Sequence, residues 1–479
     1  MRFPALLLSA CLLLFSCARN PVTGKRELAI SEEKELALGE QNHPAIIQQM
    51  GVYDDEGLNA LLQRVGKEMA AESHRPELDW HFTIVDSDVV NAFAVPGGYV
   101  YFTRGILAHF NNEAEFAGVL GHEIGHVTAR HSAQQLRKQQ LAQVGMVAGA
   151  LASNTVRQNF DAVNQGMQLL FLKYGRDAES ESDQLGVEYS SELGYDANYM
   201  AGFFQTIDRL QQRSGQEIPD FLSTHPDPLN REARVRELAD EWAEKLPGEQ
   251  DRVGREEYLR LIDGIIYGED PAQGYTENGT FYHPVLKFSF DVPRGWQLVN
   301  SPTQVQMGSP KQDAVVSFTL EQASSPEAAA QAWQQNNQVQ AQRSGAETIN
   351  GQPAYRIEGV ATTGQQGGQQ QEIAWVVTFV ELGGQVYSFT GLTLAAAARA
   401  NSSALLLPAN SFGVLTDPQY LNRQPERVRV KTVTQPTTLR DFLLANGTQG
   451  GRLDELAILN GMPLTEQLSA GTLVKTLGD

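Results

Sequence analysis

Two histidines four residues apart, with a glutamate beside the first, form the pattern that most clearly indicates chemistry: His122-Glu123-Ile124-Gly125-His126. On a helix, residues four apart share one face, so both imidazoles can bind one metal ion while Glu123 lies next to it. A purely structural role would leave three polar side chains on a largely apolar helix without a purpose. The motif therefore predicts a zinc site, with one Zn2+ per chain.

A catalytic zinc ion takes three protein ligands and keeps one position open for water. His131 lies five residues past His126, which is roughly 140° around a continuing helix, and is poorly placed as the third ligand. A metzincin arrangement is excluded, because Ala129 stands where it needs a glycine and Ser132 where it needs a histidine. A carboxylate from a second helix is the alternative.

The acidic segment 176–183 could supply this carboxylate. Glu179 and Asp183 are four residues apart and share one helical face, with Glu181 roughly opposite. Glu179 would complete a His-His-Glu site, and Asp183 could hydrogen-bond a ligand histidine or a developing charge. Spacing alone leaves this open, since acid-rich helix faces are also common as solvated surface.

Four motifs follow one another in order along the N-terminal half: Asn91-Ala92-Phe93-Ala94 with Pro96-Gly97-Gly98, His122 to His126, Arg176 with Glu179 and Asp183, and Thr224-His225-Pro226. Together they resemble one gluzincin family of zinc metallopeptidases, which includes the HtpX-type and CaaX-prenyl-protease-type enzymes. Within it, the chain is most similar to the periplasmic β-barrel assembly-enhancing proteases and their lipoprotein relatives. The similarity covers about residues 20–245.

The resemblance implies that His122, His126 and Glu179 bind zinc and that Glu123 is the catalytic base. Zinc would polarise the scissile carbonyl and acidify a water molecule, whose proton Glu123 takes and passes to the leaving amine. The strand near Phe93 would offer an edge to an extended substrate, a mode that reads backbone rather than side chains. We therefore expect a zinc metalloendopeptidase that hydrolyses unfolded or misassembled envelope proteins.

Other positions extend this comparison. Asp183 matches an acid that acts as a proton donor in the family, while Gly175 and Ser182 stand where the family usually has Ser and Ala, a difference expected to affect packing rather than chemistry. His225 or Arg231 could stabilise the oxyanion. In periplasmic relatives the histidine of the Thr-His-Pro loop can instead bind zinc as a fourth ligand and keep the enzyme latent. A helix-capping role for His225 is the structural alternative.

The first residues are typical of a bacterial secretion signal. A positive start precedes an apolar run that is too short for a membrane span of about 20 residues. Leu14-Phe15-Ser16-Cys17 resembles a lipobox, in which Cys17 is acylated after residues 1–16 are removed; ordinary secretion is the alternative. Ala18 favours the outer membrane over the inner one. We expect a periplasmic lipoprotein that contacts the membrane through Cys17.

Composition excludes some partners. The 479 residues carry 37 Lys and Arg against 57 Asp and Glu, a net charge of −20, which argues against nucleic acid as a partner. The competing function is a lipid-anchored chaperone or scaffold at the cell wall, either with a structural zinc ion or as a latent protease. A structural site would not need Glu123 and would normally close with four ligands.

The fold class expected is α+β: a mainly helical protease domain with a small sheet, an α+β domain and a small LysM-like module. Helices are predicted over 55–71, 113–140, 177–193 and 328–342, and strands over 80–85, 99–103, 286–290 and 375–389. The predicted boundaries are a signal peptide at 1–16, a lipid anchor and tether at 17–45, the protease domain at 46–265, a linker at 266–284, an accessory domain at 285–415, a linker at 416–426 and the module at 427–479.

The last module is similar to LysM modules, which bind N-acetylglucosamine polymers. Leu459-Asn460-Gly461 and the segment 470–473 fit that pattern, whereas its usual Gly-Asp-Thr opening reads Pro436-Thr437-Thr438. The resemblance makes peptidoglycan a possible partner.

Overall fold

A computed structural model describes residues 17–147, 174–214, 221, 224–225, 228–246, 248, 250–362 and 372–478. The segment 1–16, expected to be a signal peptide, lies outside these residues. Within the part of the chain described, no helix combines the length and the apolar character that crossing a membrane requires. The mixture of helices and strands confirms the α+β class.

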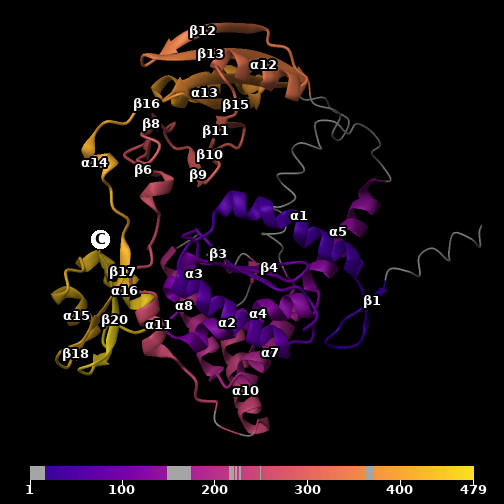
Figure 1. Cartoon of the computed structure of the whole chain (residues 1–479), viewed down its shortest axis with the longest axis vertical. Coiled ribbons are helices and arrows are strands. Elements are labelled where there is room, and N and C mark those ends of the chain that lie inside the picture. The colour runs from indigo at the N-terminus through magenta and orange to yellow at the C-terminus, as the bar shows by residue number, and fades with distance from the viewer. Residues whose placement is uncertain are drawn as a thin grey trace, which may run out of the picture.

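The N-terminal domain surrounds a three-stranded sheet with helices (Figure 1). The strand order is β3-β5-β4, with β3 parallel and β4 antiparallel to the central β5. The strands are β3 His81–Val85, β4 Ala92–Val95 and β5 Tyr99–Thr103. The helices are α1 Glu32–Met50, α2 Glu56–Glu72, α3 Arg104–His109, α4 Glu113–Thr128, α5 His131–Val147, α7 Arg176–Glu192, α8 Asn198–Ser214, α10 Pro228–Lys245 and α11 Arg255–Leu261, and the hairpin β1 Cys17–Arg19 with β2 Arg26–Leu28 precedes them.

The segment 113–140, predicted as one helix, is two helices in the structure. Helix α4 ends at Thr128, and α5 begins at His131. Between them Arg130 takes a left-handed conformation, with φ 61°. That conformation is unusual for a residue with a side chain, and the Arg130 guanidinium is held by Glu35 Oε2 at 2.7 Å and by the carbonyl oxygen of Ile30 at 2.9 Å.

The middle domain is built on a seven-stranded antiparallel sheet of order β12-β13-β14-β15-β11-β10-β9. Alternate residues of β14 enter two separate cores, one under α12 and one under α13. The predicted helix 328–342 lies at 326–337, because Ser325 caps its start and Gln338 ends it with φ 53°. The elements are α12 Pro326–Asn337, α13 Ala398–Ser411, β9 Gln297–Ser301, β10 Gln304–Gly308, β11 Ala314–Glu321, β12 Arg343–Ile349, β13 Gln352–Thr362, β14 Glu372–Leu382 and β15 Gln385–Leu394.

A smaller sheet of order β16-β8-β7-β6 packs beside it. Two of its strands lie within the segment 266–284 that the sequence predicts as a linker. The strands are β6 Tyr275–Glu277, β7 Thr280–His283, β8 Phe288–Asp291 and β16 Gly413–Val414, and the short helix α14 Pro418–Leu421 leads toward the last module.

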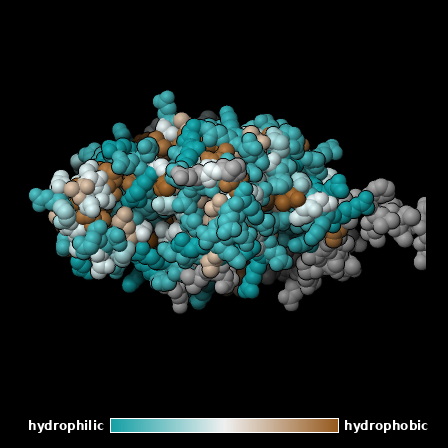
Figure 2. Space-filling model, turned by 90° about the horizontal axis from the view of Figure 1, so that it is seen from below, coloured by the Kyte–Doolittle hydropathy of each residue, from teal (hydrophilic) through white to brown (hydrophobic). Residues whose placement is uncertain are grey.

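The C-terminal module runs strand, helix, helix, strand. Its elements are β17 Arg427–Thr432, α15 Leu439–Ala445, α16 Leu453–Leu459 and β20 Leu473–Gly478, with the short pair β18 Thr437–Thr438 and β19 Gln467–Leu468. Strands β17 and β20 pair antiparallel. The module lies against the N-terminal domain beside α11 (Figure 1), and Val428 and Leu473 belong to the hydrophobic core of that domain. On the face seen in Figure 2 the molecule is predominantly hydrophilic, with apolar residues in small patches.

Lys475 connects this module to the N-terminal domain through buried hydrogen bonds. Its side chain is fully buried, and Nζ donates to the carbonyl oxygens of Ala108 at 2.9 Å and Phe110 at 3.0 Å. These carbonyls lie at the C-terminal end of α3, where the helix dipole favours a positive charge. The contact joins residues 365 or more positions apart, directly before α4.

We predict that Lys475→Met destabilises the protein by about 1–3 kcal/mol, because buried carbonyl oxygens lose their donor. Urea unfolding followed by circular dichroism measures the change. Lys431→Met, at an exposed position of β17 in the same module, is the matched control and should leave the midpoint in place. Equal midpoints for the two variants would contradict the assignment.

Candidate metal centre

Helices α4 and α7 approach closely because glycines line their contact. A methyl group on Gly121 would lie 3.0 Å from Gly186 Cα, and one on Gly186 would lie 3.0 Å from the backbone nitrogen of His122. Small residues at such a crossing let two backbones nearly touch. The histidines of α4 therefore face the carboxylates of α7 directly.

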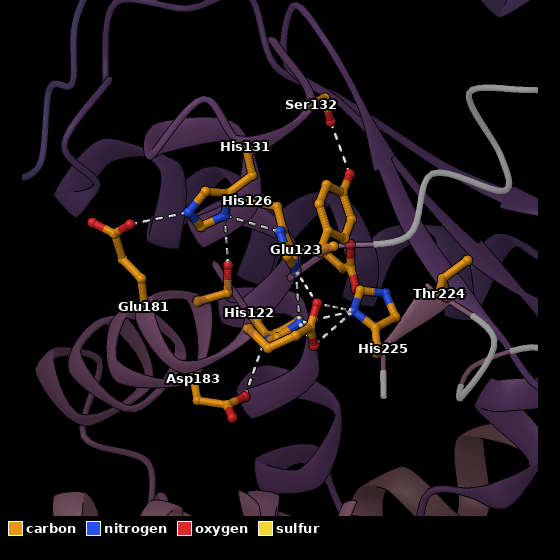
Figure 3. Close-up of polar contacts among 12 residues, drawn as sticks. His122, Glu123, His126, His131, Ser132, Glu181, Asp183, Thr224 and His225 are labelled. Carbon is orange, nitrogen blue, oxygen red and sulfur yellow. Dashed lines mark hydrogen bonds and ion pairs between the residues drawn. The ribbon is translucent and has the colours of Figure 1, made fainter. Parts of the chain in front are cut away.

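Four buried side chains converge where these helices meet: His122, His126, Glu179 and His225. The Nε2 atoms of His122 and His126 are 3.0 Å apart, and Nδ1 of His225 lies 3.2 Å from His122 Nε2. Glu179 lies within 3.5 Å of His126 and 3.2 Å of His225. One ligand atom from each residue falls within 4.8 Å of all the others, as Figure 3 shows for the labelled histidines.

The residues present fit a zinc ion. Imidazole nitrogen with one carboxylate is a donor set that zinc prefers, and nitrogen lone pairs that face one another need a shared cation or proton. Glu123 supports the same conclusion. It is fully buried, and Oε1 lies 3.5 Å from His225 Nε2 without a hydrogen-bond partner among the residues that the structure describes. Its burial raises the pKa of Glu123.

Asp183 and Arg231 form a buried pair beside this cluster. Arg231 donates to both oxygens of Asp183, at 2.8 and 2.6 Å, and its Nη1 lies 2.9 Å from Glu179. Asp183 Oδ1 in turn lies 3.0 Å from His122 Nδ1, the ring nitrogen that points away from the cluster. Burial raises the pKa of Asp183, but the guanidinium outweighs burial and holds this pKa well below its ordinary value.

Tyr174 covers His126, and no pattern in the sequence points to this contact. Its ring stacks on that of His126, with centroids 4.1 Å apart and planes inclined by 25°. The Tyr174 hydroxyl is 2.8 Å from the hydroxyl of Ser132, so it points away from the metal cluster.

His131 is also part of this site, although not as a ligand. Its Nδ1 lies 3.0 Å from His126 Nδ1, and its Nε2 lies 3.0 Å from Glu181. The sequence does not predict this contact, because a single helix over 113–140 would place His131 away from His126. Ser182 was expected to affect packing only, but its hydroxyl lies 3.2 Å from His131 Nδ1.

Two histidines on one helix, an adjacent buried glutamate and a carboxylate from a second helix define a metallopeptidase site. Residues 57–239 match the model of peptidase family M48, and this stretch contains all four convergent side chains together with Glu123.

Named relatives agree with this assignment. The chain is 32% identical over 180 residues to the mitochondrial metalloendopeptidase OMA1 of Arabidopsis thaliana, covering 36% of this chain and 35% of that protein. It is 29% identical over 220 residues to the beta-barrel assembly-enhancing protease of Yersinia pestis and 26% identical over 224 residues to that of Escherichia coli K12. Those two matches each cover 44% of this chain and 45% of the relative. The chain thus spans less than half the length of these relatives.

We predict that Gly186→Ala weakens zinc binding by about tenfold or more and lowers stability by ~1–3 kcal/mol, because the new methyl group forces α4 and α7 apart. Competition with a chromophoric chelator measures the affinity. Gly202→Ala is the matched control, since Gly202 lies in α8 with nothing within 4 Å of the new methyl. The close-packing argument fails if both variants bind zinc equally well.

Proposed function

We propose that the protein is a zinc-dependent metalloendopeptidase of the bacterial cell envelope that hydrolyses unfolded or misassembled proteins. The observation that carries the proposal is the buried glutamate Glu123 beside the convergent donors His122, His126 and Glu179. A structural metal site has no use for a buried carboxylate that faces the donors without binding the metal. The names of the relatives, a metalloendopeptidase and assembly-enhancing proteases, support the same class.

In this proposal His122, His126 and Glu179 would bind zinc. Glu123 transfers protons, and Asp183 orients a ligand histidine. Bound zinc supplies Lewis acidity for the scissile carbonyl and for the attacking water. Glu123, with its raised pKa, accepts a proton from the water and returns it to the leaving amine. Asp183 keeps His122 in the tautomer that presents Nε2 to the metal. It is ionised and paired with Arg231, which suits this orienting role better than proton donation.

The substrate would add to the edge strand β4. This strand occupies one end of the order β3-β5-β4, and it contacts α4. An added strand uses backbone hydrogen bonds, which gives broad specificity for extended chains. All four residues of β4, Ala92–Val95, are buried, so the edge must be uncovered before a substrate can pair with it.

His225 accounts for a latent state. With four donors the cluster can close around zinc and leave no position for water. His225 is buried, and both Glu179 and Glu123 lie within 3.5 Å of its ring. The four-donor geometry favours a second candidate function, in which the latent protein acts as a chaperone or scaffold until His225 leaves.

Anchoring and partners follow from the sequence. The lipobox-like segment supports acylation at Cys17 and attachment to the outer membrane on the periplasmic side. The strand-helix-helix-strand order of residues 427–479 supports a LysM-like fold and, through it, contact with peptidoglycan. Similarity to the HtpX-type and CaaX-prenyl-protease-type enzymes is proposed on the same motifs.

We predict that Glu123→Gln lowers cleavage of casein by about 10²–10⁴-fold, because the general base is lost, while zinc affinity stays at the parental value. The lipid-free chain is assayed with stoichiometric zinc and with zinc removed by chelation. Chelation should abolish cleavage as completely as the substitution does. Cleavage that persists in both cases would contradict the proposal.

We predict that His225→Ala raises casein cleavage. If the closed site holds about 90% of the molecules, opening it gives about a tenfold increase. A fall in activity would instead assign His225 to oxyanion stabilisation. The double variant with Glu123→Gln is the control, and it should be inactive.

A further inference from the structure

A polar chain runs from the metal cluster to the surface through His131. One end is His126, whose Nε2 lies 3.0 Å from His122 Nε2 and therefore faces the metal. Its other ring nitrogen, Nδ1, meets Nδ1 of His131 at 3.0 Å. At the far end, Glu181 Oε2 lies 3.0 Å from His131 Nε2. Figure 3 shows these three side chains in sequence.

Zinc binding by His126 would determine which ring nitrogens of His126 and His131 carry a hydrogen. If His126 offers the Nε2 lone pair to zinc, a neutral ring must carry its hydrogen on Nδ1. His131 Nδ1 is then the acceptor, and the hydrogen of His131 sits on Nε2. The carboxylate of Glu181 lies 3.0 Å from this nitrogen and can accept the hydrogen. Every donor has an acceptor in this assignment.

The turn before His131 orients the His131 ring toward His126. Arg130 is left-handed, and the carboxylate of Glu35 and the carbonyl of Ile30 hold it. Glu35 is itself buried between Arg130 and Arg75, at 2.7 and 2.8 Å. Without this turn, a continuing helix would carry His131 away from His126.

Ser182 adds a feature from α7. Its hydroxyl lies 3.2 Å from the same acceptor atom, His131 Nδ1. If the hydroxyl donates there, it shares the single lone pair of this nitrogen with the N–H of His126. Ser182 therefore adds a second, weaker contact that holds the ring of His131. The same helix carries the acceptor Glu181 one residue earlier.

We infer that His131 is a positioning residue for the metal ligand His126, and that Glu181 and Ser182 hold it in the accepting tautomer. It plays for His126 the part that Asp183 plays for His122. The two ligand histidines are thus oriented differently, one by a carboxylate directly and the other by a carboxylate through a second imidazole. This inference rests on the proposed function only in taking His126 as a zinc ligand.

Zinc binding tests the inference without any measurement of proteolysis. Full-length lipid-free protein carrying Glu123→Gln avoids self-cleavage, and affinity is read by competition with a chromophoric chelator. His131→Leu should weaken zinc binding by about 10- to 100-fold. His131→Asn, whose amide oxygen can still accept from His126, should recover most of this loss. Cobalt substitution adds a spectrum, in which only the leucine variant should shift its visible bands.

Glu181→Ala and Ser182→Ala keep the inference testable if the leucine variant does not fold. Glu181 is part-exposed, so its removal leaves the core intact, and we expect up to about a tenfold loss of affinity. Glu192→Ala and Ser190→Ala are the matched controls on α7, one exposed and one bonded to its own helix. Both should bind zinc like the parent.

The inference is overturned if His131→Leu and Glu181→Ala bind zinc within twofold of their controls with unchanged cobalt spectra. The proposed function fails by a different result, namely full zinc occupancy with no casein cleavage by either the parent or His225→Ala. The two failures are therefore distinguishable.

Discussion

The contact between α4 and α7 is the constraint on which the rest of the structure depends. A methyl group on Gly121 or Gly186 would lie only 3.0 Å from the backbone of the other helix, and this close contact lets imidazoles and carboxylates from two helices share one buried volume. Burying that many ionisable groups is costly unless each is paired. Arg231 lowers this cost, because its guanidinium pairs with Asp183 and Glu179 together. A metal ion bound at the four donors would compensate the groups that Arg231 does not reach.

Helix α4 is fixed at both ends by residues from distant parts of the chain. At its start, Lys475 binds the carbonyls of residues 108 and 110. At its end, the Arg130 turn is held by Glu35 of α1, and Arg75 also reaches the carbonyl of Val127. The N-terminal segment and the C-terminal module therefore both help to set the position of α4.

The sequence alone predicts those site residues whose arrangement depends only on local spacing. The pair His122 and His126 needs only helical periodicity, and Glu179 needed the family resemblance to stand out from an ordinary acidic helix face. The break at Arg130 could not be predicted, because neither glycine nor proline marks it and the bonds that hold it come from the distant residues Ile30 and Glu35. Glu181 was placed opposite Glu179 correctly, but its partner became visible only once the break redirected the chain. Strand β4 was expected near Phe93 through the family resemblance rather than from its own pattern, because four apolar residues in a row show no alternation.

The buried state of the site restricts how it can open. His225 donates its backbone N–H to Phe221 at 2.8 Å, and its ring stacks on that of Phe221 with centroids 4.7 Å apart. These two residues therefore tend to move as one unit. Arg231, six residues further on, is bound to α7 through Asp183 and Glu179 and has no such freedom. Displacing Phe221 and His225 would thus remove one of the four donors while His122, His126 and Glu179 keep their places.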